Sequence, residues 1–165
     1  MKSTIAFITL LTVSSWALAQ EELEDDYAPT DADDIAITKA VKSIGGAEKY
    51  LKAVSKVLSK QLPKRLDDAT SLIGCSSEGK QLTLIYKLHK VQYFAGFSGA
   101  AARLQRYTTR EICNSPEGRV LTAEFDVTYR YVYFGNSQKN LLSYEIDKST
   151  CIEISESYER ALKRK

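Results

Sequence analysis

Few residues in this chain could carry out acid–base or nucleophilic chemistry. His89 is the only histidine, and it falls on the polar side of a segment with alternating hydrophobicity. A Ser-His-Asp or Cys-His site would have to use this residue, yet no GxSxG motif accompanies any serine. The pattern therefore favours an exposed strand histidine over a nucleophilic active site.

Four carboxylates offer the other route to catalysis. Glu124 and Asp126 alternate along one strand-like segment, and Glu145 and Asp147 alternate along the next. Placed opposite each other, they would form a carboxylate pair of the glycosidase type. The same spacing is typical of the solvent face of a sheet, here interleaved with Arg130, and we favour that interpretation.

The sequence lacks the motifs of metal and cofactor sites. One histidine and three scattered cysteines give no CxxC, HxxxH or HExxH spacing. Asp67, Asp68 and Glu78 stand in predicted turns, where carboxylates are ordinary and bind cations only weakly. Gly45 and Gly46 lack the other residues of a Walker A or GxGxxG loop. We therefore expect no metal, no cofactor and no enzymatic activity.

Tyrosine is prominent, with ten copies in 165 residues. Tyr129, Tyr131 and Tyr133 alternate along one segment, and Tyr144 lies on the next. Two interpretations remain open. The rings either cover the helix-facing side of a sheet with their hydroxyls at its rim, or form an aromatic surface that binds a peptide, a glycan or a protein.

The three cysteines are an odd number, which in an oxidising compartment favours one disulfide and one unpaired thiol. Cys113 precedes the tyrosine-rich segment and Cys151 follows the last strand, whereas Cys75 lies in an apolar run. This placement favours the pair Cys113–Cys151. Cys75 would then be a buried, inert thiol, with a reactive thiol or an intermolecular link as the alternatives.

Periodicity predicts the elements that position these residues. Apolar spacing of three and four predicts helices over 47–62 and 98–113, with a weaker helix that starts near Asp33 and ends at Gly45 and Gly46. Alternation predicts strands over 69–75, 80–91, 121–134 and 140–147, with residues 114–118 as a turn. The order α-β-β-α-β-β predicts an α+β fold, in which helices cover one face of an antiparallel sheet of about four strands in two hairpins.

The N-terminal residues indicate an exported protein. Residues 1–19 combine Lys2, a short apolar run and a small-residue cleavage site at Ala17 to Ala19, which is typical of a signal peptide cleaved after Ala19. We expect an acidic disordered leader over 20–34, one α+β domain over 35–152 and a basic tail over 153–165. The protein is then expected to be periplasmic or secreted.

Charge is distributed unevenly along the chain. Residues 20–34 hold eight acidic and no basic side chains, whereas residues 35–165 carry a net charge of +9. The basic residues are scattered and match no nucleic-acid-binding motif, so we expect no nucleic acid partner. The regular exposed lysines at 49, 52, 56 and 60 leave contact with a membrane surface as a minor alternative.

Several short segments resemble a recurring set of small exported bacterial proteins, largely uncharacterised. They are LPKRLDDATSL (62–72), LTLIYKL (82–88), YRYVYF (129–134) and SYEIDKSTC (143–151), together with Cys113. The shared pattern is LPK…DxxT…C…YxY…C over about residues 58–151. More distantly, the layout resembles the β-type pilotins of type II secretion, which help outer-membrane secretins reach their place.

This resemblance implies that Cys113 and Cys151 pair, and that Pro63, Asp67 and Thr70 shape the entry to the first strand. It implies no catalytic residues. The chain departs from the pilotins in lacking a lipobox cysteine, and it adds Cys75 and the acidic leader.

We therefore expect an exported, non-enzymatic binding or accessory module of the periplasm, pilotin-like or chaperone-like, that acts in envelope or secretion assembly. Its partner would be an envelope or secreted protein, held at a sheet edge or at the tyrosine face. The alternatives are a secreted inhibitor or effector and, less favoured, a hydrolase that uses the strand carboxylates.

Overall fold

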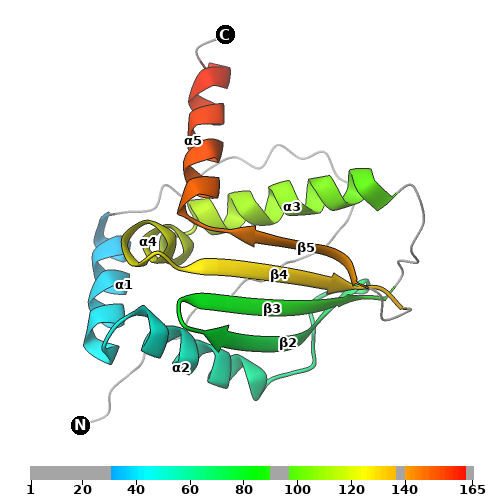
Figure 1. Cartoon of the computed structure of the whole chain (residues 1–165), viewed down its shortest axis with the longest axis horizontal. Helices are drawn as coiled ribbons and strands as arrows, with labels where there is room; N and C mark the ends of the chain where they lie inside the picture. The colour runs from blue at the N-terminus through cyan, green and yellow to red at the C-terminus, as the bar shows by residue number, and fades with distance from the viewer. Residues whose placement is uncertain (1–30, 90–96, 137–139, 163–165) are drawn as a thin grey trace.

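The computed structural model describes residues 31–89, 97–136 and 140–162 (Figure 1). The predicted signal peptide and residues 20–30 of the predicted leader lie outside these residues. The elements are α1 (Asp31–Ile44), α2 (Ala47–Ser59), β1 (Lys64–Arg65), β2 (Thr70–Glu78), β3 (Gln81–Leu88), α3 (Phe97–Asn114), α4 (Pro116–Phe125), β4 (Thr128–Phe134), β5 (Asn140–Ile146) and α5 (Lys148–Leu162). Within the described ranges, no helix combines the length and apolar character needed to cross a membrane.

The strands form one five-stranded sheet in the order β1-β2-β3-β4-β5. The α+β prediction is confirmed, and both predicted hairpins, β2–β3 and β4–β5, are antiparallel. The prediction of a wholly antiparallel sheet was wrong, because β3 and β4 pair in parallel. Two helices, α3 and α4, separate these strands in the sequence, and parallel neighbours need a long crossover of this kind.

The predicted strand over 121–134 was too long at its start. Residues 116–125 form α4, and β4 begins at Thr128. The Ser115 side chain accepts a 3.1 Å hydrogen bond from the Gly118 N–H, and Pro116 occupies the first turn, a common way to begin a helix. Asp126 then ends α4 in the left-handed conformation, at φ 54°. The predicted turn over 114–118 is therefore a helix start.

The N-terminal helices differ slightly from their predicted bounds. α1 begins at Asp31, so the last four residues of the predicted acidic leader belong to the folded domain. Gly45 and Gly46 separate α1 from α2 as predicted, and both have positive φ, 95° and 103°. Such values suit glycine, which has no Cβ to clash with the backbone. At the other end, α5 already begins at Lys148 and takes in most of the predicted basic tail.

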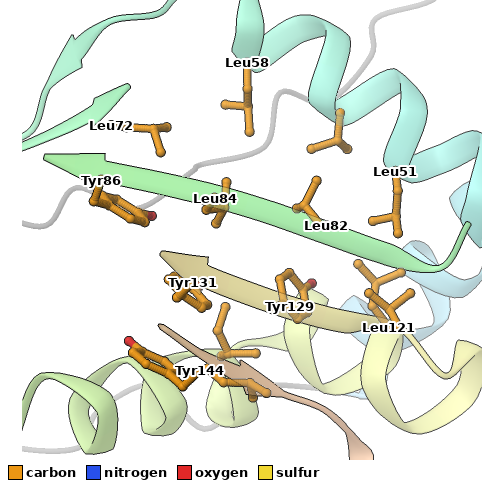
Figure 2. Packing of buried hydrophobic residues seen from close by; sticks show 14 of the residues in the cluster. Leu51, Leu58, Leu72, Leu82, Leu84, Tyr86, Leu121, Tyr129, Tyr131 and Tyr144 are labelled. Atoms are coloured by element: carbon orange, nitrogen blue, oxygen red, sulfur yellow. The ribbon is translucent and has the colours of Figure 1, made fainter. Parts of the chain in front are cut away.

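The register of the strands assigns every side chain to one of two faces. Leu84, Tyr131 and Tyr144 lie opposite one another across β3, β4 and β5, and all three are buried on the helix-covered face (Figure 2). α2 covers the β2 side of this face and α3 covers the β5 side (Figure 1). Ile85 and Val132 lie opposite each other on the other face, which no described helix covers, and they stay partly exposed.

Candidate functional site

The four carboxylates considered for catalysis do not come together. Glu124 lies on α4, where it accepts a 3.0 Å hydrogen bond from Thr38 of α1. Asp126 lies 3.4 Å from the Lys80 ammonium. The carboxylate pair considered as the alternative is not formed, because the segment that carries Glu124 is helical and Asp126 ends that helix.

The other two carboxylates have structural partners. Glu145 accepts a 3.2 Å hydrogen bond from Gln81 on the uncovered face of the sheet. Asp147 accepts a 2.9 Å hydrogen bond from the Thr150 N–H at the start of α5. The hydrogen bonds from Thr150 and Ser149 hold the pKa of Asp147 below its usual range. The arrangement positions α5 against the end of β5 and offers no acid–base pair.

His89 follows β3 and is half-buried, so its prediction as an exposed strand residue was wrong. Its Nε2 lies 2.7 Å from the Ser71 Oγ, and its backbone N–H donates to Ala69. No described carboxylate hydrogen bonds to this imidazole, so the triad geometry of a serine hydrolase is missing there. The contact ties the end of β3 to β2.

The turn carboxylates serve the local backbone. Asp67 Oδ1 accepts hydrogen bonds from the N–H groups of Ala69, at 2.6 Å, and Thr70, at 2.7 Å, and so shapes the entry to β2. Asp68 pairs with Arg65 at 3.5 Å, and Glu78 ends β2. No group of three potential metal ligands occurs in the described residues.

The four tyrosines considered as a contact surface are buried in the core. Tyr129, Tyr131, Tyr133 and Tyr144 are between 2% and 8% exposed. Tyr131, Tyr133 and Tyr144 form a stack with Tyr86, in which the Tyr86 and Tyr133 ring centres lie 5.0 Å apart and those of Tyr131 and Tyr144 lie 5.4 Å apart. Of the two interpretations, the structure places these rings on the helix-facing side, so they present no aromatic surface to a partner.

A disulfide joins Cys113 at the end of α3 to Cys151 in the first turn of α5. Cys75 is unpaired and half-buried on the helix-covered face, opposite Leu84. Burial raises the pKa of the Cys75 thiol to about 11. This thiol is therefore protonated near neutral pH and poorly nucleophilic.

One buried polar contact was missed by sequence reasoning. The Tyr50 hydroxyl of α2 donates a 2.9 Å hydrogen bond to Glu117 in the first turn of α4. Burial raises the pKa of Glu117, and the hydrogen bond from Tyr50 opposes that shift. Glu117 directly follows Pro116, and this Ser-Pro-Glu signature was the available signal for a helix start.

In the described sheet, β5 is an edge strand. Among the described strands, β5 pairs only with β4, so the backbone groups along its other side have no strand partner there. Leu141 and Leu142 are half-buried in this strand, while Ser143 and Glu145 are exposed. A free edge of this kind is a template for an added strand.

The elements around β5 hold its edge in place. Tyr144 stacks on Tyr131 beneath α3, and Thr108 of α3 lies against the hydroxyls of Tyr133 and Tyr144. The disulfide joins α3 to α5 just beyond the end of β5. α5 then extends away from the sheet (Figure 1). The β5 edge is therefore a supported surface, bounded at one end by α5.

Comparisons with known proteins give structural matches alone. No family model matches the chain, and no curated protein matches its sequence. A solved structure of a candidate secreted protein from Pseudomonas aeruginosa is similar, with 15% identity, a TM-score of 0.55, and coverage of 74% of this chain and 99% of that one.

Two pilotins of type II secretion systems are also similar in structure. EpsS from Vibrio vulnificus has 14% identity and a TM-score of 0.52, with coverage of 69% of this chain and 96% of that one. AspS from Vibrio cholerae has 13% identity and a TM-score of 0.51, with coverage of 70% of this chain and 99% of that one. At these identities the likeness establishes the fold.

Proposed function

We propose that this chain is an exported, non-enzymatic accessory protein of envelope secretion, and that it holds a peptide segment of an envelope protein along the outer edge of β5. The fold shared with two type II secretion pilotins supports the secretion role. The dispersed carboxylates and the Ser71–His89 contact without an acid support a binding role over catalysis.

The unpaired edge of β5 is the observation that carries this proposal. An extended peptide that adds to a sheet edge gains main-chain hydrogen bonds along its whole length, and side-chain contacts then decide which peptide fits. Leu141 and Leu142 provide half-exposed apolar surface, and Ser143 and Glu145 provide polar contacts beside it. A partner segment with alternating apolar and polar residues would match this strand.

Site-specific photo-crosslinking tests the proposal. A photoreactive residue is placed at Ser143 on β5 or, as a matched control, at Ser76 on β2, since both are exposed strand serines. In the envelope fraction, we expect the Ser143 probe to form an adduct whose mass identifies a component of a secretion complex, and the Ser76 probe to form none. Equal labelling from both positions, or adducts only with unrelated proteins, would contradict the proposal.

An edge-blocking variant provides the second measurement. A lysine on an edge strand disfavours strand addition because its charge would have to lie beside the incoming chain. With the probe moved to Leu141, Ser143→Lys should abolish the adduct and Ser76→Lys should leave it intact. Recovery of the protein from the spent medium alone, and never from the periplasmic fraction, would instead favour a secreted inhibitor or effector.

A further inference from the structure

A groove with a volume of about 740 Å³ follows one side of α1. Six α1 residues and Glu124 of α4 line it; the α1 residues are Asp34, Ile35, Thr38, Lys39, Lys42 and Ser43. Their spacing of about four residues places them on a single stripe of the helix. Ile35 is 67% exposed, so the groove has an uncovered apolar side chain near its N-terminal end.

The two ends of this α1 groove differ in charge. At the N-terminal end, Asp34 is held by Arg119 at 2.7 Å, and Glu124 accepts the hydrogen bond from Thr38. At the C-terminal end stand Lys39 and Lys42, both exposed. Neither lysine has an ion-pair partner in the part of the chain that the structure describes. The groove therefore has two available positive charges, and its acids are already engaged.

The segment that directly precedes α1 has the complementary order of residues. Residues 20–30 read QEELEDDYAPT, with acids at 21, 22, 24, 25 and 26 and no charge over 27–30. An extended chain covers roughly 3.3–3.6 Å per residue, so Asp26 lies within about 17 Å of Asp31. Along the helix, Lys39 and Lys42 lie about 12 and about 16 Å from Asp31, at 1.5 Å per residue.

We propose that residues 20–30 of this chain turn back and dock in the α1 groove. In this register, the acids at 24–26 meet Lys39 and Lys42, and the uncharged residues 27–30 lie beside Ile35 and the engaged Asp34. The leader is tethered at Asp31, so it occupies the groove at high effective concentration without any partner. Exposed ion pairs are weak and screened by salt, so high salt should release the leader from the groove.

Paramagnetic broadening in the full mature chain tests this placement. A nitroxide is attached to the cysteine of a Leu23→Cys, Cys75→Ser double variant. This variant keeps every acid of the leader, and residue 23 then carries the only thiol outside the disulfide, so the label attaches at one position. At low salt we expect the backbone amides of residues 38–43 to broaden, and the amides of β3 on the uncovered sheet face to stay sharp. At about 1 M salt, where the Debye length is about 3 Å, the broadening should be lost.

Charge reversal separates the groove from general attraction to a basic surface. The double variant Lys39→Glu with Lys42→Glu should lose the broadening at residues 38–43. The matched variant Lys56→Glu with Lys60→Glu carries the same change on exposed lysines of α2 and its C-cap, and should retain it. Equal loss in both variants, or no preferential broadening at low salt, would overturn the proposal. So would loss of broadening on dilution into unlabelled protein, which would indicate a second copy as the occupant.

Discussion

The Tyr50 hydroxyl and the Glu117 carboxylate meet at 2.9 Å and join α2 to the first turn of α4. Burial is the main reason that the pKa of Glu117 is raised, and the hydrogen bond from Tyr50 offsets part of the shift. The carboxylate also contributes, after burial, to the raised pKa of Tyr129 on β4. Glu117 is thus a partly buried acid between α2 and α4, where burial disfavours its ionised form.

Replacing this acid should make the protein less sensitive to pH. Because the pKa of Glu117 is raised in the folded protein, folding favours its protonated form. The contribution of Glu117 to the free energy of unfolding therefore falls as the pH rises above about 4.5, the pKa of this side chain in the unfolded chain. We expect Glu117→Gln to unfold at a higher denaturant concentration than the parent protein at pH 7, with little difference at pH 4. Denaturant titrations at the two pH values measure this difference.

Tyr50→Phe serves as the control for that experiment. It leaves the carboxylate buried without its donor, which should lower the free energy of unfolding by about 1–3 kcal/mol at pH 7. A Glu117→Gln variant that is less stable than the parent protein at pH 7 would contradict the assigned cost.

Gly118 should tolerate no side chain. A Cβ at this position would overlap the Ile112 carbonyl oxygen and lie 2.8 Å from the Ser115 Oγ that caps α4. Gly118→Ala should therefore displace the start of α4 and cost about 1–3 kcal/mol, as measured by thermal or denaturant unfolding. Gly99→Ala is the matched control in α3, because nothing lies within 4 Å of its Cβ position. Equal effects of the two variants would contradict this packing.

Removal of the disulfide should lower the free energy of unfolding more than any of the substitutions above. The bond closes a loop with a sequence separation of 38 residues, which corresponds to about 4 kcal/mol in the chain-entropy account. We expect the Cys113→Ser, Cys151→Ser double variant to lose roughly this much stability in denaturant titrations. Unchanged unfolding under reducing conditions would contradict the expected contribution.

Cys75 should react slowly with alkylating reagents while the protein is folded. The pKa of its thiol is about 11 because the side chain is half-buried, so little thiolate exists near neutral pH. We expect iodoacetamide at pH 7.5 to label Cys75 slowly in the native protein and rapidly after denaturation, as followed by intact mass. Rapid native labelling would indicate a reactive thiol after all.

Nitration of tyrosine should distinguish surface rings from core rings. Tyr107 on α3 is 50% exposed, whereas Tyr131 is 2% exposed. We expect mass spectrometry after brief nitration to find modified Tyr107 and unmodified Tyr131 and Tyr133. Early nitration of the stacked tyrosines in the folded protein would show that these rings are accessible to solvent, and would support their role as a contact surface.

Sequence reasoning succeeded where one local pattern was enough. The α2 stripe of Leu51, Val54 and Leu58, the break at Gly45 and Gly46, and the alternation in β3 each depend on neighbouring residues. It failed at α4, because the short run from Leu121 to Phe125 was joined to the true strand that follows. It also missed the parallel pairing of β3 with β4, since strand direction depends on where the intervening chain returns.

The candidate site was only partly accessible from sequence. Tyrosine alternation correctly indicates one face of β4, but the alternation is the same whether helices or solvent cover that face. The Tyr50–Glu117 contact joins residues 67 positions apart. The unpaired edge of β5 likewise becomes visible only when the order of all the strands is known.

The parallel contact between β3 and β4 also has a consequence for folding. The β2–β3 hairpin pairs residues that are close in the sequence, whereas the β3–β4 pairs, such as Gln81 with Thr128, join residues 47 positions apart. Such non-local pairs form slowly, because the long loop between them has to close first. The β3 edge is therefore open to aggregation in partly folded states until β4 pairs with it.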